Sequence, residues 1–97
     1  MSKKHPVCAL NVAPHYLDKK RWAICTMTVS DAGCFGLKWI TTECVAIFDT
    51  KYQASGAAIA MSNNMRVLMY EGLKKGDPVT YKQSVELDIC GLLDHLK

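Results

Sequence analysis

Residues 22–30, WAICTMTVS, decide the fold class, because apolar and hydroxyl side chains alternate along them. Four apolar side chains lie on one face of an extended chain and three hydroxyl side chains on the other: Ala23, Cys25, Met27 and Val29 against Thr26, Thr28 and Ser30. This alternation predicts a half-buried antiparallel strand. Asp31-Ala32-Gly33 then predicts a turn, since glycine can supply a positive φ.

Further strands are expected on both sides of this segment. Residues 6–12 predict a short strand that ends at Ala13-Pro14, and residues 15–21 form a polar connection. Residues 37–40 and 44–48 are rich in β-branched and aromatic side chains, so they predict one long bent strand or two strands. A helix over residues 42–52 is the alternative, because short apolar runs do not reveal their period.

The middle of the chain is open to two interpretations. Ala54-Ser55-Gly56 has the chemistry of a turn and precedes a weak apolar run over residues 57–61. Ser62 then predicts a helix N-cap, and Gly76 predicts the end of that helix. Four apolar side chains follow the cap at helical spacing: Met65, Leu68, Met69 and Leu73. A hairpin that turns at Asn63-Asn64 is the alternative to this helix over residues 62–75.

The last third predicts an amphipathic strand followed by a helix. Val79, Tyr81 and Val85 alternate with polar residues, as in a half-buried strand. From residue 84 or 85 onward, a helical stripe predicts burial: Ile89, Leu92, Leu93 and Leu96. The complete pattern predicts an α+β fold, a mainly antiparallel sheet with two helices, the C-terminal helix packed across it, in a single domain of residues 1–97.

Composition excludes several classes of protein. The chain has 97 residues, of which 49% are hydrophobic and 22% charged, so intrinsic disorder is not expected. No apolar run approaches 18 residues, and no secretory signal is visible, so neither a membrane span nor export is expected. A net charge of +3 gives only weak attraction for nucleic acid.

The cysteines predict a reducing compartment. There are five, an odd number, and none forms a C-x-x-C pair. We expect all five to be reduced in a cytoplasmic protein, with Cys25 and Cys44 buried inside apolar strands. Cys34 alone is flanked by turn residues and is the cysteine expected to be accessible.

No motif assigns a catalytic residue. Histidine and cysteine do not occur at the short spacings of metal ligands, so no metal and no cofactor is expected. Phosphate-binding loops and the G-x-S-x-G elbow are also missing from the sequence. An enzyme with a Cys/His or carboxylate site assembled by the fold is the third functional hypothesis.

Residues 44–97 resemble the ribonuclease H-like fold. The resemblance rests on VAIFD at 45–49, GAAIA at 56–60, SNN at 62–64 opening a helix, and VTY at 79–81 before a last helix with GLL at 91–93. It implies the fold but not the activity, because Val67 and Gln83 replace two carboxylates that the family keeps. Two-metal hydrolysis needs converging carboxylates, and only Asp49 is left.

The leading functional hypothesis is a non-catalytic binding protein, forming a homodimer and taking a small apolar ligand or a protein partner. Methionines and a tryptophan would line its adaptable groove: Met61, Met65, Met69 and Trp39. The alternative is nucleic-acid binding through a basic segment beside an aromatic ring: Lys19, Lys20, Arg21 and Trp22. The small net charge makes this alternative the weaker of the two.

Overall fold

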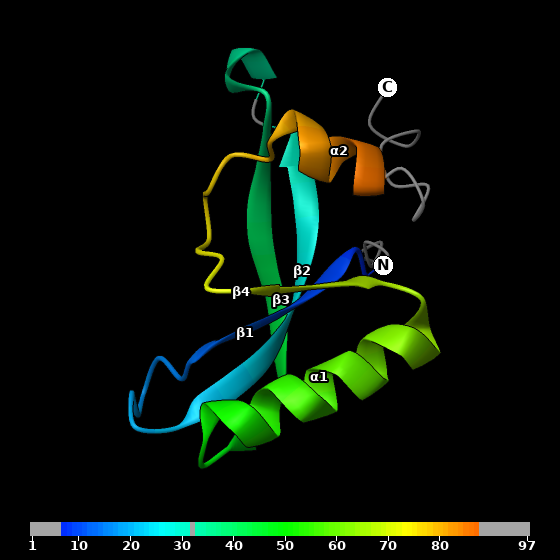
Figure 1. Cartoon of the computed structure of the whole chain (residues 1–97). Helices are drawn as coiled ribbons and strands as arrows, with labels where there is room; N and C mark the ends of the chain where they lie inside the picture. Colours follow the sequence, from blue (N-terminus) through cyan, green and yellow to red (C-terminus); the bar gives the residue numbers. More distant parts are fainter. Residues whose placement is uncertain (1–6, 32, 88–97) are drawn as a thin grey trace, which may run out of the picture.

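The computed structural model describes residues 7–31 and 33–87, which form a four-stranded sheet in the order β3-β2-β1-β4 with two α-helices (Figure 1). The strands are β1 (Ala9–Pro14), β2 (Trp22–Asp31), β3 (Leu37–Phe48) and β4 (Leu68–Glu71). The helices are α1 (Lys51–Met65) and α2 (Tyr81–Leu87), with a 3₁₀ turn η1 (Gly33–Phe35). The α+β class is confirmed, but the sheet is mixed, because β4 runs parallel to β1.

The predicted strand over residues 22–30 is β2, an interior strand covered on both faces. On one face, Ile24 packs with Ala54 and Ala58 of α1. On the other face, Met27 and Val29 pack with residues that include Leu87 of α2. Two of the three hydroxyls expected to face water are therefore buried: Thr26 is 3% exposed and Thr28 is 0% exposed. Ser30 is half-buried.

The turn after β2 has the chemistry expected of it. The Gly33 backbone N–H donates to the Asp31 carboxylate at 2.8 Å, and Gly33 has a φ of +67°. β3 then forms one long strand, so the helix alternative over residues 42–52 is wrong for all but its last residues. Register shifts between Ile24 and Cys25 and between Thr26 and Met27 are β-bulges in the β2–β3 pairing.

Threonine side chains replace backbone pairing at the second bulge. The Thr26 hydroxyl accepts a hydrogen bond from the Glu43 N–H at 3.2 Å. The Thr42 hydroxyl donates to the Thr26 carbonyl at 3.0 Å, and the two hydroxyls also contact each other. The Thr26 hydroxyl is buried and the Thr42 side chain is exposed, and together their hydrogen bonds stabilise the bend of β3.

The turn expected at residues 54–56 is wrong, since these residues lie inside α1. The helix begins after Thr50, whose side chain accepts a hydrogen bond from the Gln53 N–H at 3.2 Å. Ala54 and Ala58 are four positions apart and 0% exposed, because their small side chains let α1 lie close to the sheet. This packing outweighs the helix-weakening effect of Gly56.

The helix expected over residues 62–75 and the hairpin alternative at Asn63-Asn64 are both wrong. Ser62 lies near the end of α1, and its carbonyl accepts from the N–H groups of Arg66 and Val67. Arg66 ends the helix in the left-handed region, with a φ of 57°. The chain then continues as β4, whose Leu68 and Met69 are partners of Ala9 and Leu10 in β1.

The strand expected over residues 79–85 is wrong as well. Residues 76–79 do pair with the start of β3, through backbone hydrogen bonds to Leu37 and Trp39 and a bridge between Pro78 and Lys38. Thr80 then caps α2, and its N–H donates to the Gln83 side chain at 2.9 Å. The predicted stripe from Ile89 to Leu96 lies outside the described residues.

The strands and helices that the ribonuclease H-like resemblance implies for residues 44–97 differ from those in the structure. Val45–Phe48 is the end of β3, Val67 follows a helix instead of lying within one, and Gln83 lies in a helix instead of at a strand end. The residue correspondence that the resemblance implied is therefore wrong.

Candidate functional site

The structure brings together only two of the four residues predicted to line a groove, Met61 and Met69. Met61 in α1 and Met69 in β4 are half-buried and pack against the cluster around Leu10. Met65 is 42% exposed at the end of α1. Trp39 is 0% exposed and belongs to the cluster on the other face of the sheet, where its ring lies edge-on to Tyr70 at 5.5 Å between centroids.

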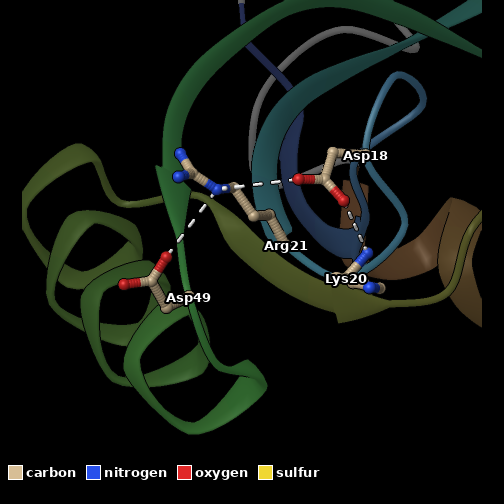
Figure 2. A network of polar contacts seen from close by, with 4 residues as sticks. All are labelled: Asp18, Lys20, Arg21 and Asp49. Atoms are coloured by element: carbon tan, nitrogen blue, oxygen red, sulfur yellow. Dashed lines mark hydrogen bonds and ion pairs between the residues drawn. The ribbon is translucent and has the colours of Figure 1, made fainter.

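The predicted basic segment is the exposed loop that joins β1 to β2. Figure 2 shows the Arg21 guanidinium between two carboxylates, with Nε 3.8 Å from an oxygen of Asp18 and 3.8 Å from an oxygen of Asp49. The Lys20 backbone N–H donates to the Asp18 carboxylate at 3.1 Å. Arg21 thus connects the β1–β2 loop to the junction between β3 and α1.

A second polar group adjoins this loop through Trp22. Trp22 is half-buried against the α1 side of the sheet, and the Lys51 ammonium lies 5.7 Å from the centroid of its ring. The same ammonium lies 3.2 Å from an oxygen of Glu71. The Ser55 hydroxyl donates to the other Glu71 oxygen at 3.0 Å.

Large uncharged side chains accompany these ion pairs at the same end of the sheet. Tyr16 and Leu17 in the loop are 78% and 75% exposed, and Tyr52 in the first turn of α1 is 89% exposed. We call this region the hairpin-end surface, defined by the loop at residues 15–21 together with Asp49, Lys51, Tyr52 and Glu71. It carries four cationic side chains, Lys19, Lys20, Arg21 and Lys51, against three carboxylates, Asp18, Asp49 and Glu71.

Glu71, one carboxylate of the hairpin-end surface, is poorly suited to accept a proton. Hydrogen bonding from Lys51, then from Ser55, together with the charge of Lys51, lowers the pKa of Glu71. A general base works best when its pKa is near the working pH, so this carboxylate is a weak base. Within residues 7–31 and 33–87, no three Cys, His, Asp or Glu side chains are placed to hold a metal ion.

Sequence reasoning missed a pair of cysteines that the fold brings together. Cys25 in β2 and Cys44 in β3 are direct partners in the strand register. The expectation that both are buried is wrong, because Cys25 is half-buried and Cys44 is exposed on an edge strand. To predict that Cys25 and Cys44 are neighbours, one would need the register in which β2 pairs with β3. Cys34 is exposed, as expected.

No family model, no curated protein and no solved structure matches this chain. Neither α1 nor α2, the helices found in the described part of the chain, is long and apolar enough to cross a membrane.

Proposed function

We propose that this protein is a non-catalytic, cytoplasmic protein-binding module that forms a homodimer through its hairpin-end surface. The observation that carries the proposal is the exposure of Tyr16, Leu17 and Tyr52 beside a cation that is already ion-paired. Tyrosine and arginine are enriched among the residues that dominate binding energy at protein interfaces. The odd number of cysteines and the lack of a C-x-x-C pair in the sequence support the cytoplasmic location.

The charges of this surface favour a protein over a nucleic acid. Affinity for a polyphosphate comes mainly from cations that displace counterions. Here Arg21 is shared between Asp18 and Asp49, and Lys51 lies against Glu71. A nucleic acid would have to displace these carboxylates or accept their repulsion.

A second copy of the chain fits the same surface. In a two-fold interface the same patch meets itself, so each patch must contain groups that complement its own. The hairpin-end surface has both charge signs within one short loop, at Asp18 and Lys19, and it has exposed apolar side chains at Leu17 and Tyr52. A uniformly basic patch would repel its copy.

Sedimentation equilibrium over a range of concentrations tests the proposal. We expect Leu17→Ser and Tyr52→Ser each to raise the dimer dissociation constant about tenfold. This is the loss of affinity expected when one residue that contributes strongly to binding is truncated. Tyr81→Ser is the matched control, because Tyr81 is 85% exposed on α2, at the other end of the molecule (Figure 1). Two results would overturn the proposal: a chain that stays monomeric at about millimolar concentration, or an equal effect of the control.

A further inference from the structure

We propose that Cys25 and Cys44 are a redox modification site, where a peroxide converts the two thiols into a cross-strand disulfide. This inference is independent of the proposed dimer, since neither cysteine belongs to the hairpin-end surface. Both cysteines are free thiols in the structure.

The strand register supplies the geometry. Cys25 of β2 and Cys44 of β3 are opposite each other in an antiparallel pair, so their side chains point to the same face of the sheet. Opposed residues in such pairs have Cα atoms roughly 4.5–5.5 Å apart, within the range of about 4.4–6.8 Å that disulfides span. The Cβ atoms need to approach by up to about 1 Å, since disulfides hold them at roughly 3.5–4.5 Å.

The flanking bulges give the strands room for this approach. One register shift lies directly before Cys25, and the second follows Thr26. A bulge interrupts the ladder of backbone hydrogen bonds, so the short stretch between two bulges can move with less loss of pairing than regular strand. The pair therefore lies where the regular β2–β3 ladder is interrupted on both sides.

The two thiols differ in a way that assigns their roles. Cys44 is exposed, and its thiol donates to the Ala46 carbonyl at 3.6 Å. Cys25 is half-buried, and burial raises the pKa of its thiol to about 11, with further contributions from the charge of Cys44 and a hydrogen bond to it. Cys44 therefore reacts first with the oxidant, and Cys25 then attacks the oxidised Cys44 sulfur.

The reaction balances with one peroxide per disulfide. The Cys44 thiol gives up its proton, its sulfur attacks one oxygen of hydrogen peroxide, and the O–O bond breaks. Cys44 becomes a sulfenic acid, and the hydroxide that leaves takes up the proton and is released as water. Cys25 then gives up its proton and attacks the Cys44 sulfur, the S–O bond breaks, and a second water leaves. The two sulfurs lose two electrons and the peroxide gains them, and an added dithiol reverses the change by exchange.

Peroxide treatment of the full chain tests the site. After oxidation, unreacted thiols are alkylated with iodoacetamide and the digest is analysed by mass spectrometry with and without prior reduction. We expect a linked peptide pair containing Cys25 and Cys44, and a melting temperature about 10 °C or more above that of the reduced chain, because the bond closes a loop of about 20 residues. Both changes should disappear after reduction with dithiothreitol.

Two variants separate the site from general thiol oxidation. Cys44→Ser should abolish the linked pair and the rise in melting temperature. Cys34→Ser should leave both intact, because Cys34 is also exposed but lies in η1. Recovery of Cys25 as the alkylated thiol while Cys44 is over-oxidised to sulfinic acid would overturn the proposal. A linked pair that forms between chains would overturn it too, which electrophoresis without reductant detects as a species of twice the mass.

Discussion

The side-chain amide of Asn11 hydrogen-bonds in both directions with the backbone of Leu73. Nδ2 donates to the Leu73 carbonyl at 2.8 Å, and the Leu73 N–H donates to Oδ1 at 3.0 Å. Asn11 is 3% exposed in the interior strand β1, so both bonds are largely shielded from water. The pair fixes the segment that follows β4 against the α2 side of the sheet, where Leu73 packs on the core.

We therefore expect Asn11→Leu to destabilise the protein by about 2–4 kcal/mol. The substitution removes two hydrogen bonds, and it leaves the N–H and carbonyl of Leu73 without their partner. Urea denaturation measures the change. Asn63→Ala, at an exposed position of α1, is the control and should change stability by less than about 0.5 kcal/mol. An equally small change for Asn11→Leu would contradict the role of the pair.

Gly56→Ala should stabilise the protein by about 0.5–1 kcal/mol, because glycine weakens a helix interior and an alanine Cβ would meet no atom within 4 Å. Gly72→Ala should have the opposite sign, since Gly72 has a φ of +77° that alanine adopts only with strain. Thermal and urea denaturation of both variants measure the two signs. Destabilisation by Gly56→Ala would argue against the position of α1.

The ionisation of Glu71 should stabilise the folded state. Because Lys51 and Ser55 lower its pKa, the folded carboxyl titrates below the ordinary value of about 4.3. Its contribution to stability is present above pH ~4.3 and is lost as the pH falls through the lower, folded pKa. An NMR titration of the Glu71 carboxyl carbon measures the shift. Lys51→Met should raise this pKa, whereas Lys19→Met should leave it unchanged.

Generic single-stranded and double-stranded DNA and RNA should bind no more tightly than about 10⁻⁴ M at physiological salt, the weak limit of non-specific association. Fluorescence anisotropy with labelled oligonucleotides measures the affinity. A micromolar complex that weakens steeply with salt, and that is lost when Lys19, Lys20 and Arg21 are all replaced by alanine, would contradict the proposed protein partner.

The parts of the fold that depend on local pattern could be predicted from the sequence. β2 has an alternating pattern, and the turn at Asp31 and Gly33 has side-chain chemistry that acts over two residues. The burial of Thr26 and Thr28 could not be predicted, because it depends on elements packed against both faces of β2.

α1 lies at residues other than those the pattern predicts for a helix, whereas α2 begins three or four residues before the predicted start of the C-terminal helix. Both begin at the same pattern, Thr50-x-x-Gln53 and Thr80-x-x-Gln83, in which a threonine side chain accepts from the N–H three residues later. Ala54-Ser55-Gly56 has the composition of a turn, but glycine is tolerated in a helix when neighbouring alanines pack well.

In the candidate site too, local features could be predicted from the sequence, whereas contacts between distant segments could not. The exposure of the loop at residues 15–21 follows from its polar composition, and the structure agrees. The ion pair between Arg21 and Asp49, and the approach of Cys25 to Cys44, depend on how β2 pairs with β3. Two bulges set that register, and side-chain alternation alone does not locate them.

β1 lies between β2, which is close to it in the sequence, and β4, which is far from it in the sequence. This arrangement affects the order of folding. β1 joins β2 through a short hairpin, whereas its other neighbour, β4, arrives only after the whole of β3 and α1. Asn11 and Leu73 are separated by 62 positions, and closing so long a loop has a larger entropic cost than closing a hairpin. We expect the three antiparallel strands to form first, which leaves one side of β1 unpaired until β4 docks. During that interval β1 is an open strand edge to which other chains can add, so refolding yield should fall as the protein concentration rises.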